Sequence, residues 1–227
     1  MKKSLKAISQ NVQRLFRRSP YRTVRAAGGG HAYVHRTANV HPSVQLGRGT
    51  YVHEGAAVRE YTFIGPDCHI GPFAKIGPDC VLEERSWVSR SADLKGNVIV
   101  GADAMIGVRT VIEYNVRIGP GTLIAEDSVV GAETNIAPGV MLGPRAVIEE
   151  HGRNYLCGVF LGRFKCAAYR TRDGEIMVRI GRRAYTLDKW KAGRLTDKLI
   201  AKYSSGSAAR RYKRALRLWL ELVELML

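Results

Sequence analysis

A six-residue repeat dominates the middle of this chain. Every sixth residue from Val34 through Ile148 is Val, Leu or Ile, without exception. The residue two places before each of these aliphatics, from Ala38 to Ala146, is always Ala, Ser, Thr, Cys or Val. A period this strict is typical of a chain built from stacked short units, none of which can bury a core by itself.

Turn-forming residues follow the same period. Seven of the eight prolines lie two places after a repeat aliphatic, and Gly, Asn or Asp is common at the third place. Proline presets φ for a turn, and Gly, Asn and Asp tolerate positive φ. Each hexad is therefore expected to be a short strand and a tight turn, with the aliphatic and the small residue facing inward. Three hexads close one triangular coil, so the repeat predicts a prism of about 6–7 coils.

This pattern resembles the hexapeptide-repeat proteins, and the resemblance covers residues 34 to about 153. It implies an all-β, left-handed parallel β-helix, in proteins that are usually homotrimers. The run HIGPFAKIGPDCVLEE is similar to the β-helices of sugar-nucleotide acyltransferases and of sugar-1-phosphate nucleotidyl/acetyltransferases. The resemblance implies transfer of an acyl group from an acyl-CoA donor, such as acetyl-CoA, to a hydroxyl or amine of a sugar or nucleotide sugar.

Charge divides the chain into a nearly neutral middle and two basic ends. Residues 1–30 carry a net charge of +8, residues 31–153 of −3 and residues 154–227 of +11, for a formal total of +16. We expect a basic amphipathic helical segment in 1–30, the β-helix in 31–153, a small antiparallel β module in 154–187 and a basic helical segment in 188–227. The basic ends suit nucleic acid, phosphate-bearing ligands or a membrane surface, and solvated charged faces are the plainer alternative.

The C-terminal part leaves the hexad period. VFLGRFKCAAYRT and EIMVRIG are expected to form a hairpin across Asp173–Gly174, with RRAYTL as a third strand. DKWKAGRLTDKLIAKY and SAARRYKRALRLWLELVELML are expected to be two helices that break at Ser205–Gly206. The end of the last helix is too apolar to face water. It must pack on the body, on a partner chain or on a membrane surface.

One outward-facing column of the prism is apolar where a solvated face would be polar. These residues recur every three hexads, one place before a repeat aliphatic, and a contiguous apolar stripe of this kind indicates an interface. We expect it to be the contact of a homotrimer, and the alternative is that the chain's own C-terminal segment covers it. The column consists of Tyr33, Tyr51, His69, Trp87, Met105, Leu123 and Met141.

His69 is the candidate general base, because it is the one titratable group in this column and an imidazole titrates near neutral pH. Asp67, in the preceding turn, is its expected carboxylate neighbour. The alternative is a histidine that only packs in the interface. The candidates for binding the phosphates of the donor belong to the basic C-terminal part; they are Arg163, Lys165, Arg182 and Arg183.

Two rival functions stay open from the sequence. His35 and His53 should stack in adjacent coils and, with a third ligand from His31, His41 or another subunit, would resemble the metal site of γ-class carbonic anhydrases. We expect no metal, since these spacings lack the close histidine pair of that family. The second rival is a non-catalytic trimeric scaffold whose basic ends bind nucleic acid or another acidic partner. It is favoured by the absence, after Ile148, of the paired prolines and Gly-Asn-Pro-Ala segment that close many small acetyltransferases.

The sequence also favours a cytoplasmic protein. The basic start of the chain lacks the uninterrupted apolar run of a signal peptide. No stretch reaches the ~18 apolar residues of a membrane-spanning helix. Four cysteines in 227 residues do not form a disulfide framework, so a reducing compartment is the default.

Overall fold

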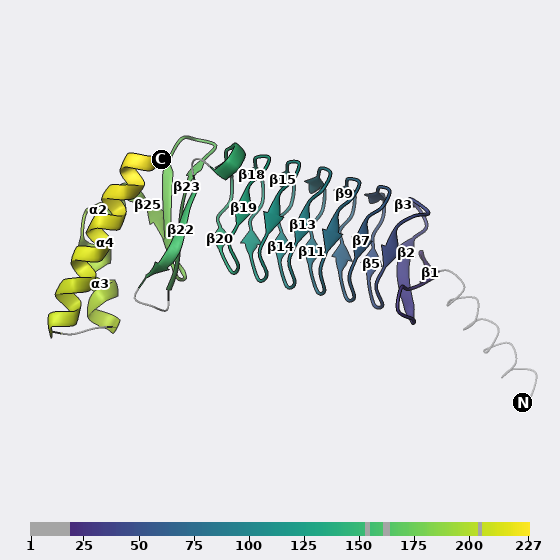
Figure 1. The fold of residues 1–227 in the computed structure, drawn as a ribbon, viewed down its shortest axis with the longest axis horizontal. Coiled ribbons are helices and arrows are strands. Elements are labelled where there is room, and N and C mark those ends of the chain that lie inside the picture. Colours follow the sequence, from purple (N-terminus) through teal and green to yellow (C-terminus); the bar gives the residue numbers. More distant parts are fainter. Residues whose placement is uncertain (1–18, 153–154, 161–163, 204–205) are drawn as a thin grey trace, which may run out of the picture.

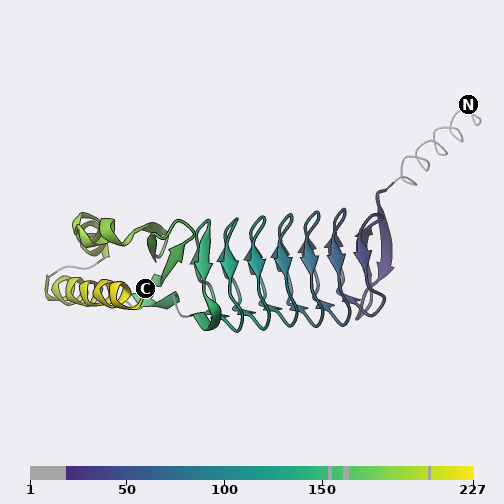
Figure 2. The ribbon, with the colours of Figure 1, turned by 90° about the horizontal axis from the view of Figure 1, so that it is seen from above.

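The computed structural model describes residues 19–152, 155–160, 164–203 and 206–227. The middle of the chain is a triangular prism, a left-handed parallel β-helix, with a mixed β and helical module at its C-terminal end (Figures 1 and 2). The expected amphipathic pattern of the N-terminal segment falls mostly on residues 1–18, which lie outside the described residues.

Three parallel sheets form the sides of the prism. The first carries the apolar column and consists of β2 (His31–His35), β5 (Tyr51–Val52), β8 (His69–Ile70), β11 (Trp87–Val88), β14 (Met105–Ile106), β17 (Leu123–Ile124) and β20 (Met141–Leu142). The second consists of β3 (Asn39–Val40), β6 (Ala57–Val58), β9 (Lys75–Ile76), β12 (Asp93–Leu94), β15 (Val111–Ile112), β18 (Val129–Val130) and β21 (Ala146–Ile148). The third consists of β4 (Gln45–Leu46), β7 (Phe63–Ile64), β10 (Val81–Leu82), β13 (Ile99–Val100), β16 (Arg117–Ile118) and β19 (Asn135–Ile136).

Each strand pairs in register with the strand one coil later, so that Tyr51 lies beside His69 and His69 beside Trp87. The backbone hydrogen bonds run from coil to coil; the N–H of Tyr51, for example, donates to the carbonyl of Cys68 at 2.9 Å. Every repeat aliphatic except Val40 is buried and joins one continuous core. The sequence periodicity is thereby confirmed as the stacking rule of the fold.

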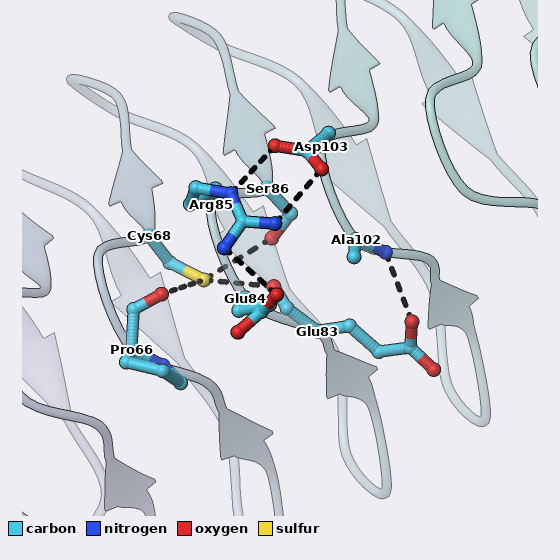
Figure 3. Close-up of polar contacts among 8 residues, drawn as sticks. All are labelled: Pro66, Cys68, Glu83, Glu84, Arg85, Ser86, Ala102 and Asp103. Atoms are coloured by element: carbon cyan, nitrogen blue, oxygen red, sulfur yellow. Dashed lines mark hydrogen bonds and ion pairs between the residues drawn. The ribbon is translucent and has the colours of Figure 1, made fainter.

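The small interior position has a second role besides fitting the narrow coil. Its hydroxyl or thiol donates to a backbone carbonyl of the next coil, as Thr50 Oγ1 does to the Gly65 carbonyl at 2.7 Å. Cys68 Sγ likewise lies 3.0 Å from the Glu83 carbonyl oxygen and 3.3 Å from Ser86 Oγ (Figure 3). These bonds pair polar groups that would otherwise be buried unsatisfied.

At its N-terminal end the first sheet begins earlier than the expected boundary at residue 31. Strand β1 (Tyr21–Arg25) turns back through a glycine run and pairs antiparallel with β2, with Tyr21 opposite His35. This added strand covers the open edge of the first coil and brings a tyrosine onto the column, with consequences for the site described below.

The C-terminal module continues the second sheet. Strand β23 (Phe164–Thr171) pairs antiparallel with β21, and β22 (Tyr155–Phe160), β24 (Ile176–Ile180) and β25 (Arg183–Thr186) join it. A short 3-10 turn, η1 (Glu150–Gly152), precedes this sheet. The hairpin across Asp173–Gly174 is as expected. The expectation of one strand over VFLGRFKCAAYRT is wrong, because the chain divides that stretch between β22 and β23.

Three helices, α2 (Leu187–Lys191), α3 (Arg194–Tyr203) and α4 (Gly206–Met226), pack against this sheet. The expected first helix is divided at Gly193, whose φ of +84° no helix can continue. Helix α3 ends at Tyr203 and α4 begins at Gly206, and the expected break residue Ser205 lies outside the described residues. Among the described helices, none is long and apolar enough to span a membrane.

Tyr169 fastens the module to the last coil, and its replacement by phenylalanine should be costly. The side chain is 1% exposed, and its hydroxyl accepts a hydrogen bond from the Gly143 N–H at 2.7 Å. We expect Tyr169→Phe to lower the free energy of unfolding by about 1–3 kcal/mol, because it leaves that buried N–H without a partner. Denaturant unfolding measures the change. Tyr114→Phe, at an exposed tyrosine, is the matched control and should be close to neutral.

Candidate functional site

Aromatic and imidazole rings stack along the start of the first sheet. The in-register pairing of β2, β5, β8 and β11 places Tyr33 on Tyr51, with ring centroids 4.7 Å apart. His69 follows, 5.4 Å from the Tyr51 centroid and 4.3 Å from that of Trp87. The His69 ring is therefore held between two aromatic faces. This fixes its orientation.

A second histidine and a tyrosine from β1 stand beside this stack. The rings of His53 and His69 stack with centroids 6.0 Å apart. Tyr21 meets the rings of Tyr51 and His53 edge-on, and its hydroxyl lies 2.7 Å from His53 Nδ1. The sequence reasoning did not include Tyr21 in the site. The alternation of YRTVR was the available signal for a strand, but nothing local indicates that the strand pairs with β2.

Burial lowers the pKa of His69 from its ordinary value of 6.5, and the nearby Asp67 carboxylate opposes that change. The pKa of His53 is also lowered, first by burial and then by the neighbouring His69 and His35, while Glu54 raises it. His69 Nδ1 is buried and has no hydrogen-bond partner among the described residues. A neutral imidazole with an unused ring nitrogen can accept or donate one proton at neutral pH.

Asp67 occupies the left-handed corner that leads into β8, with φ of 54°. Its carboxylate leans over the bare backbone of Gly49, so close that a side chain there would lie 2.1 Å from Oδ1. Arg85, at the same corner one coil later, turns the other way and binds Asp103 at 2.7 Å and Glu84 at 2.7 Å (Figure 3). Among the described residues, no hydrogen bond joins Asp67 to His69. The carboxylate therefore acts on His69 through its charge.

The rest of the apolar column stays accessible in the described part of the chain. Trp87 is 41% exposed and Met105 is 46% exposed. The C-terminal module reaches the column only at its last rung, where Arg179 Nη1 lies 3.8 Å from Met141 Sδ. The alternative that the chain's own C-terminal segment covers the column is thus wrong for Trp87 and Met105, because that module extends the second sheet instead of crossing the first.

Of the four basic residues expected to bind phosphates, the structure describes the side chains of Arg182 and Arg183. Arg163 lies outside the described residues; Lys165 falls in β23, but its side chain is not among those described. Arg182 is exposed and Arg183 half-buried, at the turn between β24 and β25. Arg182 lines a hollow of about 180 Å³ together with Arg179, Met141 and Cys166.

Arg179 is a candidate that the sequence reasoning missed. Its Nε is buried and has no hydrogen-bond partner among the described residues. Only the pairing of β24 with β23 brings it over Met141, so its position in the sequence gives no hint of the hollow. The hollow lies four coils from His69 along the same sheet, about 19 Å at the usual strand spacing.

The expected histidine neighbours mostly make local contacts. His35 Nδ1 lies 2.8 Å from Thr37 Oγ1, and His41 Nδ1 lies 2.8 Å from Ser43 Oγ. Across the described residues, no three His, Cys, Asp or Glu side chains come close enough together to hold one metal ion. A three-histidine centre of the carbonic anhydrase type is therefore not assembled within that part of a single chain.

Comparison with known proteins agrees with the repeat. The family described as GMPPB C-terminal domain matches residues 57–152. No curated protein matches the chain. Among solved structures, the acetyltransferase domain of PglB from Neisseria gonorrhoeae, in complex with acetyl coenzyme A, is 24% identical over 49% of this chain and 54% of its own, with a TM-score of 0.48.

Two further structures are similar to about half of the chain. A mutant of perosamine N-acetyltransferase from Caulobacter crescentus, in complex with CoA and GDP-perosamine, is 28% identical over 51% of each chain, with a TM-score of 0.30. A mutant of AntD, an N-acyltransferase from Bacillus cereus in complex with dTDP and coenzyme A, is 14% identical over 52% of this chain and 75% of its own, with a TM-score of 0.31. This chain spans about half the length of the first two of these structures.

The unbroken hexad register and the three in-register parallel sheets lead to one assignment. The chain is built from hexapeptide repeats and folds as a left-handed parallel β-helix.

Proposed function

We propose that this protein is an acyltransferase that moves an acyl group from an acyl-CoA donor to a hydroxyl or amine of a sugar or nucleotide sugar. The observation that carries the proposal is the half-buried His69, whose imidazole is held between Tyr51 and Trp87 in the column. Its lowered pKa keeps the imidazole neutral at pH 7, the form that accepts a proton. In the proposed role, His69 is the general base.

The chemistry uses one proton twice. His69 takes the proton from the acceptor hydroxyl or amine as that atom attacks the thioester carbonyl carbon. The carbon–sulfur bond then breaks, and the imidazolium returns the proton to the departing thiolate, so that the products are the acylated acceptor and free CoA. The charge of Asp67 stabilises the imidazolium while it exists, because an opposite charge nearby favours the charged form.

The donor is proposed to lie along the first sheet, with its thioester at His69 and its phosphates at the other end. Arg179 and Arg182 line the hollow beside Met141, about 19 Å away at the usual strand spacing. An extended phosphopantetheine arm can cover a distance of this order. Guanidinium groups suit phosphate because their planar donors pair with its oxygens. Arg183 adds positive charge at the same turn.

A second copy of the chain is proposed to complete the site. The exposed Trp87 and Met105 continue the column beyond His69, and an apolar stripe on an outward face favours burial against another subunit. We propose a homotrimer in which the columns, from Tyr33 to Met141, line the contacts between prisms. His69 would then lie at a subunit boundary, where the partner prism excludes water from the reacting groups.

Donor binding to the native oligomer tests the proposal. Acetyl-CoA at about a hundred times its dissociation constant should stabilise the protein by about 2.7 kcal/mol, which raises the melting temperature by several degrees. Double replacement Arg179→Gln with Arg182→Gln should remove most of that shift. Arg59→Gln with Arg117→Gln, at exposed positions of the β-helix, is the charge-matched control and should keep it.

The rival proposal is a non-catalytic trimeric scaffold whose basic ends bind an acidic polymer. It expects no thermal shift with any acyl-CoA. It also expects salt-sensitive binding of nucleic acid that is lost when the basic ends are neutralised. The acyltransferase proposal fails if acetyl-CoA and longer acyl-CoA thioesters all leave the melting temperature unchanged.

A further inference from the structure

Helix α4 has an outer ridge in which leucines predominate over the second half, with the exposed Glu221 at the edge of the ridge. Leu216, Leu220 and Val223 are buried and pack into the cluster formed by α2, α3 and the C-terminal sheet. At 100° per residue, the opposite side of the helix carries Leu218, Leu222 and Leu225. These three side chains are 56%, 44% and 84% exposed.

This ridge departs from what a surface helix should show. A helix that packs on one side normally presents polar and charged residues on the other. Here the three leucines recur at spacings of four and three, so they form one continuous stripe, and Met226 is 51% exposed beside its end. Within the described residues, no other part of the chain covers the stripe.

The first half of the same ridge is basic. Arg211 and Arg214 lie seven and four residues before Leu218, on the same side of the helix, and both are exposed. Arg210 and Arg217 flank them and are exposed as well. Two other charged groups of the helix are already paired within the module: Lys213 with Asp197 at 2.7 Å and Glu224 with Lys191 at 2.6 Å. The ridge arginines therefore remain for an external anion.

The ridge is basic in its first half and mainly apolar in its second half. This order disfavours a second copy of α4 as the partner that covers the ridge. Full-length antiparallel pairing of two such helices would place the arginines of one ridge against the leucines of the other. Parallel pairing would match the leucines but place Arg211 and Arg214 against the same residues of the partner. Both arrangements leave charges uncompensated or buried against apolar groups, which is costly.

An anionic bilayer surface satisfies both halves at once. Arginine side chains reach the lipid phosphates at the headgroup level, while leucines enter the boundary between headgroups and acyl chains. The placement of the helix agrees with this use. In Figures 1 and 2, α4 lies at the C-terminal end of the molecule, beyond the last coil and far from β1. We propose that the outer ridge of α4 docks the protein on membranes that contain anionic lipids, with the helix lying flat on the surface. This inference is independent of the acyltransferase proposal.

The test is co-sedimentation of the full chain with vesicles. Vesicles of phosphatidylcholine mixed with phosphatidylglycerol should bind the protein at least tenfold more tightly than vesicles of phosphatidylcholine alone. Triple replacement Leu218→Gln, Leu222→Gln and Leu225→Gln should weaken binding to the anionic vesicles at least tenfold. These side chains are exposed, so the far-ultraviolet circular dichroism and the melting temperature should be unchanged.

Two controls distinguish binding through the ridge from non-specific binding to vesicles. Tyr61→Gln with Tyr114→Gln removes exposed aromatic surface from the β-helix and should leave vesicle binding as it was. Arg211→Gln with Arg214→Gln should reduce the preference for anionic vesicles, whereas Arg59→Gln with Arg117→Gln should not.

Three results would overturn the inference. Equal binding of the triple leucine variant and the unaltered protein would mean that another segment carries any vesicle affinity. A smaller oligomer for that variant in light scattering would mean that a second copy covers the ridge. Binding to neither vesicle type would exclude the membrane as the occupant.

Discussion

Replacement of His69 by alanine should lower kcat/KM for acyl transfer by about 10²–10⁴-fold, the usual contribution of a general base. The physical reason is that Tyr51 and Trp87 hold this imidazole in one orientation, and no other group of the column can take the acceptor's proton. Turnover with acetyl-CoA and a panel of amino sugars and nucleotide sugars measures the loss. The melting temperature and oligomeric mass should change little, since His69 is only half-buried.

The pH profile gives a second readout that a packing role would not move. The pKa of His69 lies below 6.5, so kcat/KM should be flat near neutral pH and fall as the pH drops through that lowered value. His69→Gln keeps a polar side chain of similar size but removes the titrating nitrogen. This variant should be as inactive as the alanine variant. His41→Ala, at an exposed histidine bonded to Ser43, is the control and should retain full activity. An active His69→Ala variant would show that the histidine only packs against its neighbours in the column.

Gly107→Ala should be among the most destabilising single-methyl additions in the chain. A Cβ at this position would lie 2.5 Å from the backbone carbon of Ala125 and 2.5 Å from the backbone nitrogen of Glu126. The Gly107 N–H also donates to the Ile124 carbonyl at 2.7 Å, so the two coils cannot separate without losing that bond. We expect a loss of about 3 kcal/mol of unfolding free energy, the upper end of the usual cost of overpacking. Urea unfolding measures it.

Gly96→Ala is the matched control in the same part of the β-helix. A Cβ there would meet Pro78 at 3.4 Å and Tyr114 at 3.5 Å, which is ordinary van der Waals contact. Its backbone φ is not positive, so alanine fits without strain, and the restricted unfolded chain should make the variant neutral or slightly more stable. Equal stability of the two variants would contradict the proposed close approach of successive coils at Gly107.

These two glycines show which features of the β-helix the sequence repeat can explain and which it cannot. In the sequence, Gly107 directly follows the repeat aliphatic Ile106, and Gly is an ordinary turn former. At Gly107, however, the backbone does not need positive φ; glycine is required because the next coil passes too close for a Cβ. The sequence pattern shows that glycine recurs at this position. Only the distance between successive coils explains why a larger residue does not fit there.

The candidate site divides in the same way. Strands of the same sheet recur every three hexads. The sequence therefore predicted that His69 lies between Tyr51 and Trp87, and the strand register confirms this. It could not supply Tyr21, which reaches His53 only because β1 folds back on β2. Nor could it supply Arg179, which meets Met141 only through the pairing of β24 with β23 and of β23 with β21. Both contacts depend on antiparallel pairings outside the repeat, where no period indicates the partner.

By itself, the sequence determined the β-helix, its register, its core and the column that carries His69. Inside a repeat, each residue's surroundings are other residues at a constant spacing, so local pattern and tertiary contact are the same information. Only the tertiary structure decided what closes the two ends of the prism and which side of α4 is left without cover. Those outcomes depend on packing between segments that share no sequence period. One side of α4 packs on the C-terminal sheet and the other helices, and its opposite side stays exposed.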